Sequence, residues 1–363
     1  MQNRPDTYFE DNYTQPTSPS GHRLSHEERR ARRRRRQRMR RIRNTAIAAA
    51  VLFLVGMFFL FTDRQQAEEP TPSQPEAVQP VSTPVLPPEP VEEAPSRGLQ
   101  MTEQTAAISD AFPSEFAVLA DLDSGEIVAE KNSDVMINPA SMTKILTLLV
   151  AVEQISDLNA SFTMTFDITD YCYVNECSVV GYEVGDVIPV DELFYGCILS
   201  SGADASLALA QVAAGSHEAF VDLMNEKLEE LGLSETSHFT NCVGLYDEEH
   251  YCTVQDMALM LKAALENDKC REVLSTKVFT TSPTEKYPNG QDLSNWFIRR
   301  IEDEDTGDAR VFCGKTGYVS QSGFCAASCA EAEDGKNYLC VTGNSNSTWQ
   351  SIYDHAELFK TYL

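Results

Sequence analysis

The stretch "INPASMTKILTLLVAVE", Ile137–Glu153, is the most informative segment of the chain, because it places a lysine inside a run that is otherwise apolar. Its apolar residues recur at helical spacing, so the stretch predicts a helix that begins near Pro139. Ser141 and Lys144 then lie one turn apart on the same helix face. A structural interpretation has Ser141 start the helix while Lys144 extends its amine to water. A catalytic interpretation makes Ser141 a nucleophile whose proton is taken by a desolvated Lys144, and it requires partners elsewhere in the chain.

Strands and helices are predicted on both sides of this segment. Residues 115–132, "EFAVLADLDSGEIVAEKN", have the alternating apolar positions and central turn of a β-hairpin. Helices are predicted in residues 190–215 with a break at Ser200–Gly202, in residues 216–231, in residues 253–265 and in residues 347–363, and strands in residues 311–319, 323–332 and 337–344. Strands at both ends with helices between them predict an α+β fold for residues 101–363. Its antiparallel sheet is closed by N- and C-terminal elements and flanked by helices.

The N-terminal region has the charge pattern of a membrane anchor. Residues 1–43 hold 13 Arg against 5 Asp and Glu, whereas residues 101–363 hold 14 Lys and Arg against 43 Asp and Glu. Residues 45–62 carry no charge and are long enough to cross a bilayer. Arginines before a span keep that side in the cytoplasm, so this pattern favours a topology signal over a nucleic-acid site. A cleavable signal peptide would have a shorter charged region and a clear cleavage site, so an uncleaved anchor is the favoured interpretation.

The predicted organisation is a basic cytoplasmic tail (1–44), a transmembrane signal anchor (45–62), a linker (63–100) and an extracytoplasmic catalytic domain (101–363). The linker holds 9 of the 17 prolines and no aromatic residue. Proline-rich chain is stiff and extends by about 3 Å per residue, so the linker spans up to roughly 100 Å. The domain is therefore expected to work at a distance from the membrane.

All 10 cysteines lie in residues 172–340, on the outer side of the membrane in this topology. An even number in an exported domain permits disulfides, and Cys172 and Cys177 are near enough in sequence to close a small loop. The alternative is that the cysteines are small buried apolar residues. No cysteine or histidine spacing typical of zinc appears, so no metal and no cofactor are expected.

Two further motifs supply the partners that the catalytic interpretation requires. "SSGADA" places Ser201 at the break between two helices, and "GKTGY" places Lys315 and Thr316 on a strand with a glycine on each side. Each motif alone is ordinary turn or strand chemistry. In the order Ser-x-x-Lys, Ser-Gly-x and Lys-Thr-Gly, they are the motif set of penicillin-binding proteins and class A β-lactamases.

With these motifs, residues 105–363 resemble the low-molecular-weight penicillin-binding proteins that act as serine D-alanyl-D-alanine carboxypeptidases. The segment "TNCVGLYDEEHYCTVQDMA" is similar to that family's Thr-Asn-x-x-Gly-Leu and His-Tyr-Ser-Thr segment, with Cys252 in place of serine. For His250 within it, a structural role in a turn is favoured over a catalytic one. The resemblance implies a peptidoglycan stem peptide as substrate, β-lactams as inhibitors, and no nucleic acid.

Burial explains why Lys144 faces inward. An ammonium group cannot accept the serine proton, but burial disfavours the charged form of a lysine and lowers its pKa towards neutrality. A helix N-terminus at Ser141 also stabilises developing negative charge. The resemblance implies the remaining roles. The N–H groups of Ser141 and Tyr318 hold the oxyanion, and Ser201 passes a proton to the departing D-alanine. Lys315 and Thr316 hold the substrate carboxylate, and Gly317 lets the peptide lie against the strand.

One position departs from the family pattern. The middle motif of the family ends in asparagine, and here that position is Ala203. The loss of one polar contact leaves open a catalytically weak or silent module that binds the wall or senses β-lactams. A β-lactamase is a second alternative, but no Glu-x-x-Leu-Asn segment stands between the second and third motifs. The conjunction of Ser141, Lys144, Ser201 and Lys315 favours the peptidase.

Overall fold

The computed structural model of the protein describes residues 98–363. The predicted tail (1–44) and membrane span (45–62) lie outside the described residues, as does the linker up to residue 97. From residue 98 onward, no helix is both long enough and apolar enough to cross a membrane.

One mixed six-stranded sheet forms the centre of the described region, with strand order β1-β3-β2-β10-β9-β8. Its strands are β1 (Gln100–Ala107), β2 (Phe116–Asp121), β3 (Glu126–Lys131), β8 (Arg310–Val319), β9 (Gly323–Glu331) and β10 (Asn337–Ser345). β2 and β3 form the predicted hairpin, and β10 pairs antiparallel with β2, so segments from the two ends of this region meet in the sheet. The prediction of a purely antiparallel sheet was wrong at one edge, where β1 pairs parallel with β3.

β1 was not predicted because its sequence "QMTEQTAA" is polar and its residues are mostly exposed or half-buried. An edge strand with little apolar surface carries no alternating pattern to recognise. β1 also begins at Gln100, so the last residue of the expected linker is already part of the sheet.

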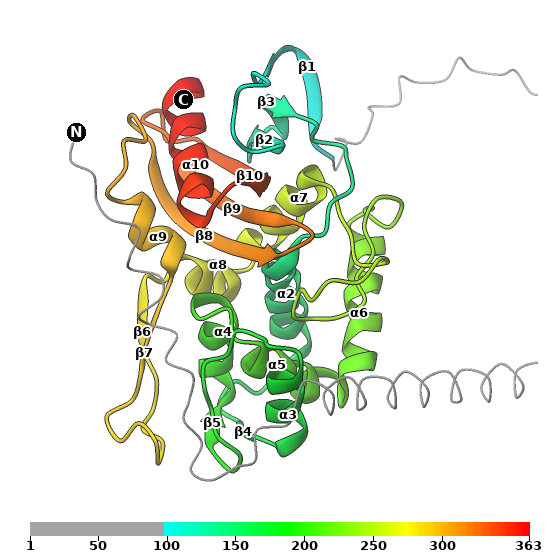
Figure 1. Ribbon diagram of the computed structural model, residues 1–363, viewed down its shortest axis with the longest axis vertical. Helices are drawn as coiled ribbons and strands as arrows, with labels where there is room; N and C mark the ends of the chain where they lie inside the picture. The colour runs from blue at the N-terminus through cyan, green and yellow to red at the C-terminus, as the bar shows by residue number, and fades with distance from the viewer. Residues whose placement is uncertain (1–97) are drawn as a thin grey trace, which may run out of the picture. The chain divides into compact units, whose positions relative to one another are not determined.

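Helices cover both faces of the sheet, as Figure 1 shows. The larger apolar core lies on the face covered by α2 (Lys144–Gln154), α4 (Val190–Leu199), α5 (Ala203–Ala214) and α7 (Val254–Glu266). A smaller core lies on the other face, beneath α9 (Trp296–Ile301) and α10 (Thr348–Tyr362). In β2, Val118 packs into the larger core and Leu119 into the smaller one, which explains why this strand is apolar at consecutive positions.

The helices predicted from the sequence are present. The break at Ser200–Gly202 separates α4 from α5, and Thr253 and Asp256 form a capping box at the start of α7. α6 spans His217–Glu230. The elements that were not predicted are mostly short: β4 (Ser161–Thr163), α3 (Phe166–Val174), β5 (Val187–Pro189), α8 (Asp268–Ser275), β6 (Val278–Thr280), β7 (Asp292–Ser294) and α9.

The segment Ile137–Glu153 positions the first two candidate site residues. A 3₁₀ turn, η1 (Ala140–Thr143), leads directly into α2, which is buried for most of its length among the other helices. η1 packs against the edge strand β8. The two motifs on η1–α2 and β8 are therefore adjacent, although more than 160 residues separate them in sequence.

Candidate active site

Ser141 and Lys144 face each other at the junction of η1 and α2. Ser141 lies in the 3₁₀ turn rather than in the α-helix expected from the sequence, and Lys144 is the first residue of α2. The Nζ of Lys144 donates a hydrogen bond to the Oγ of Ser141 at 3.1 Å. Lys144 is only 2% exposed, so the structural interpretation in which its amine reaches water was wrong.

Burial sets the protonation of Lys144. Desolvation lowers the pKa of its amine from the ordinary value, and this effect exceeds the opposing influence of nearby cysteine thiols. The second partner of Nζ is the backbone carbonyl of Val243, at 2.6 Å. Lys144 is therefore fixed in position beside Ser141, and its neutral form is favoured more than in an exposed lysine.

The side chain of Asn241 holds the loop that carries the Val243 carbonyl. Its Oδ1 accepts hydrogen bonds from the N–H groups of Val243 (3.2 Å), Gly244 (2.8 Å) and Leu245 (3.0 Å), and its Nδ2 donates to the Leu245 carbonyl at 2.9 Å. Asn241 is thus a positioning residue for Lys144. The sequence did not predict this role, and only the resemblance of "TNCVGL" to the family segment pointed to this asparagine.

His250 supports the same region as a neutral ring. Its Nδ1 accepts from the Thr240 N–H at 3.1 Å, so Nε2 carries the proton and donates to the Oγ1 of Thr143 at 2.8 Å. Burial lowers the pKa of His250 to about 3. A histidine that stays neutral and bridges two backbone segments has a structural role, as the sequence favoured.

Ser201 and Lys315 form a second pair. The Nζ of Lys315 donates to the Oγ of Ser201 at 2.9 Å and to the Thr316 carbonyl at 2.7 Å. Ser201 has a φ of +53°, which non-glycine residues rarely adopt and which often marks functional sites. Desolvation, followed by repulsion from Lys144, lowers the pKa of Lys315 well below the ordinary lysine value. The packing of η1 against β8 brings the two pairs near each other, consistent with this repulsion.

Gly317 lies directly against the start of η1. A Cβ at this position would lie 2.9 Å from the Ser141 nitrogen and 3.0 Å from the Pro139 oxygen. The missing side chain therefore lets the backbone at Pro139 and Ser141 approach β8. The next residue, Tyr318, is 53% exposed and stacks on Phe324 with ring centroids 4.4 Å apart.

Ala203 is buried at the start of α5, with 1% of its surface exposed. Its N–H donates to the Ser178 carbonyl at 2.8 Å. The carboxylate of the next residue, Asp204, accepts from the N–H groups of Val180 and Gly181, each at 2.9 Å. The segment around residues 178–182 is thus bound to the start of α5, immediately after Ser201.

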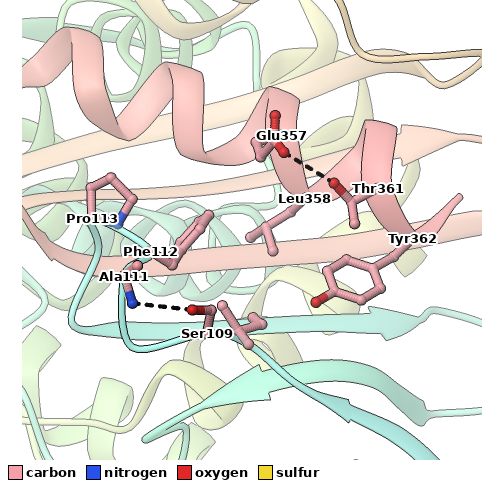
Figure 2. Close-up of a pocket in the computed structure, with 9 residues that line it drawn as sticks. Ser109, Ala111, Phe112, Pro113, Glu357, Leu358, Thr361 and Tyr362 are labelled. Atoms are coloured by element: carbon pink, nitrogen blue, oxygen red, sulfur yellow. Dashed lines mark hydrogen bonds between the residues drawn. The ribbon is translucent and has the colours of Figure 1, made fainter.

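A separate hollow on the other face of the sheet holds none of these residues. It encloses about 330 Å³ between the segment 108–113 and the C-terminal half of α10, and Figure 2 shows its lining, which includes Phe112, Leu358 and Tyr362. The lining is mostly apolar. Within residues 98–363, no cluster of three or more metal-ligating side chains occurs.

The family profile and two relatives that match this chain are those of D-alanyl-D-alanine carboxypeptidases. The profile of the D-alanyl-D-alanine carboxypeptidase family matches residues 101–346. The chain is 32% identical over 237 residues to the D-alanyl-D-alanine carboxypeptidase DacF of Bacillus subtilis, covering 65% of this chain and 58% of DacF. It is 35% identical over 159 residues to DacA of Escherichia coli, covering 42% of this chain and 39% of DacA. The chain thus spans less than two thirds of the length of these relatives.

Solved structures share the fold. The Streptomyces K15 DD-transpeptidase aligns with a TM-score of 0.61 at 24% identity, covering 70% of this chain and 100% of that one. A D-alanyl-D-alanine carboxypeptidase from Mycobacterium tuberculosis aligns with a TM-score of 0.61 at 24% identity, covering 71% of this chain and 94% of that one.

Proposed function

The chain belongs to the D-alanyl-D-alanine carboxypeptidase family, and we propose that it is a serine peptidase that removes the terminal D-alanine from peptidoglycan stem pentapeptides through an acyl-enzyme. The observation that carries this proposal is the contact of 3.1 Å between Lys144 Nζ and Ser141 Oγ. A fully buried lysine beside a serine hydroxyl meets the requirement for an activated nucleophile.

Acylation begins with the neutral form of Lys144. In that form the hydrogen bond runs from the Ser141 hydroxyl to the Lys144 nitrogen, which takes the proton as Oγ attacks the carbonyl carbon of the penultimate D-alanine. The Val243 carbonyl, 2.6 Å from Nζ, then stabilises the ammonium that forms. Asn241 keeps that carbonyl in place through the loop.

The oxyanion and the terminal carboxylate are held along β8. The N–H groups of Ser141 and Tyr318 serve as the oxyanion donors, and the close approach of η1 to Gly317 supports this arrangement. Lys315 and Thr316 bind the carboxylate of the terminal D-alanine. A bound carboxylate favours the charged form of Lys315 and offsets the effect of its burial.

Ser201 completes the turnover. Its hydroxyl accepts from Lys315 at 2.9 Å, passes its proton to the D-alanine nitrogen as the peptide bond breaks, and takes in exchange the proton that Lys144 received from Ser141, so Lys144 is neutral again. Water then attacks the ester carbon of acyl-Ser141 and Lys144 takes the water proton. Lys144 returns this proton to the Oγ of Ser141 as the ester bond breaks, and the shortened peptide leaves.

The same proposal covers the membrane and inhibitors. Residues 45–62 anchor the chain, the tail (1–44) lies in the cytoplasm, and the domain (101–363) works outside the membrane at the end of the linker. The arginine excess before residue 45 supports this membrane orientation.

β-Lactams acylate Ser141 because their ring carbonyl and carboxylate match the scissile carbonyl and the terminal carboxylate of the substrate.

The test is the release of D-alanine from a pentapeptide that ends in D-alanyl-D-alanine. The purified chain is expected to release one D-alanine per peptide and to leave the tetrapeptide. Ser141→Ala should abolish the release, and Lys144→Ala should reduce it nearly as far, because nucleophile and base act as a unit. Full turnover by Ser141→Ala, or cleavage at another bond, would overturn the proposal.

A further inference from the structure

Two cysteines are brought together where α3 ends. Glu176 has a φ of +54°, and this left-handed residue reverses the chain after the last turn of the helix. The Cys177 N–H donates to the Cys172 carbonyl at 3.0 Å, and the Glu176 N–H donates to the Tyr173 carbonyl at 3.3 Å. These two bonds are the Schellman pattern of helix termination, in which the residues at the positions of Cys172 and Cys177 place their side chains in contact.

The two thiols differ in exposure and acidity. Cys172 is buried, with 3% of its surface exposed, whereas Cys177 is half-buried. The thiols hydrogen-bond to each other, and this bond lowers the pKa of Cys177 and raises that of Cys172. Both are free in the structure. Cys177 is therefore the more reactive thiol of the pair, and Cys172 stands next to it as a resolving thiol.

The pair is linked through the chain to the segment 178–182, which we call the active-site wall because it is hydrogen-bonded to the start of α5 beside Ser201. The residues after Cys177 are the ones that bind the start of α5, through the Ser178 carbonyl and the Val180 N–H. Ser201 and Gly202 directly precede α5. A covalent change at Cys177 therefore acts on a segment that is hydrogen-bonded beside Ser201.

We propose that Cys172 and Cys177 form a reversible disulfide, and that this bond fixes the segment Cys177–Tyr182 against the start of α5. The oxidant is a small disulfide such as oxidised glutathione. The Cys177 thiolate attacks one sulfur of that disulfide, which forms a mixed disulfide and releases one thiol. Cys172, losing its proton to solvent, attacks the Cys177 sulfur and releases the second thiol. The protein thus loses two electrons and two protons, and the small disulfide is reduced to two thiols.

A second pair of cysteines in the chain serves as an internal control. Cys313 and Cys329 are direct cross-strand partners on β8 and β9, so their side chains lie side by side. Both residues are 0% exposed. The cysteines are thus close together in both pairs, but an oxidant can reach only the pair at the end of α3. Only that pair is expected to react in the folded protein.

The experiment titrates the full chain with mixtures of reduced and oxidised glutathione. Free thiols are then trapped by alkylation and the disulfides are identified by peptide mapping. We expect one linkage, Cys172–Cys177, which dithiothreitol reverses. Cys177→Ser should leave Cys172 reduced, and Cys172→Ser should leave Cys177 as a mixed disulfide with glutathione. The oxidised chain should unfold at a temperature about 4–8 °C higher than the reduced chain.

A second readout tests the effect on the active-site wall without relying on catalysis. Hydrogen exchange of the backbone amides of Val180, Gly181 and Ala203 should slow on oxidation, since the disulfide restrains the segment to which they belong. Slower exchange in the wild type, with no change in Cys172→Ser, supports the proposal. Both thiols remaining open to alkylation in excess oxidised glutathione, or oxidation of Cys313 and Cys329 first, would overturn it.

Discussion

Gly317→Ala tests whether the packing of η1 against β8 holds the nucleophile in place. The added Cβ would lie 2.9 Å from the Ser141 nitrogen, 3.0 Å from the Pro139 oxygen and 3.1 Å from the Ala140 Cβ. Two of these three atoms belong to the backbone, so a side-chain rotation cannot relieve the contact. η1 is also blocked on its other side, because Gly244 is packed so closely that a Cβ there would lie 2.0 Å from the Ala140 oxygen.

The size of the effect follows from these distances. Ordinary contact to a Cβ begins at 3.4 Å, so the separation from the Ser141 nitrogen must grow by 3.4 − 2.9, or about 0.5 Å. A misplacement of about 1 Å costs roughly a hundredfold in rate, so about 0.5 Å costs about tenfold, or about 1.4 kcal/mol in the acylation barrier. The overpacking itself should lower the free energy of unfolding by about 1–3 kcal/mol.

The assay is the second-order rate of acylation by a labelled penicillin, together with urea unfolding. Gly343→Ala on β10 is the matched control, because its Cβ would lie 2.9 Å from the Cδ1 of Ile137, the end of a flexible side chain. We expect the control to acylate at the wild-type rate within about twofold. An unchanged acylation rate in Gly317→Ala, or an equal loss in both variants, would refute the proposed role of this packing.

Three further predictions concern the base, the middle motif and acid stability. Acylation should slow at low pH as Lys144 takes a proton, at a pH below the ordinary lysine value of 10.5, because burial lowers its pKa. A rate that is flat with pH would contradict this. Ala203→Asn should speed acylation by about 10- to 100-fold if one hydrogen bond to a charged group is missing; an unchanged or lower rate would show that the site is not weakened there. Burial lowers the pKa of His355 to about 3 from 6.5, so its contribution to stability is present above pH 6.5 and is lost as the pH falls towards 3. Replacing it in His355→Asn should reduce the slope of unfolding free energy against pH in that range by about 1.4 kcal/mol per unit, as urea titrations would measure.

The elements that the sequence predicted best are those whose apolar pattern is local. The spacing of Ser141 and Lys144 predicts that they share a face, and they do, because contacts within one turn do not depend on the rest of the fold. The hairpin of β2 and β3 is local in the same sense. β1 was missed because it is polar and pairs in parallel with a strand that does not adjoin it in sequence.

The supports of the candidate site could not be predicted because they are long-range. The Val243 carbonyl reaches Lys144 across 99 residues, and no periodicity indicates which loop will lie there. The role of Asn241 depends on that loop. Gly317 shows a different limit: the family resemblance implied a close approach of the substrate peptide, and only the structure shows that η1 also packs against this glycine.

Peptide mapping of the adduct formed with a labelled penicillin identifies which serine is the nucleophile. One adduct is expected, an ester on Ser141, because the buried amine of Lys144, 3.1 Å away, activates that hydroxyl. Ser141→Ala should carry no label, while the conservative variant Ser141→Cys should still fold. A label on Ser201 or on any other serine, or a folded wild-type chain that takes up no label, would contradict the account.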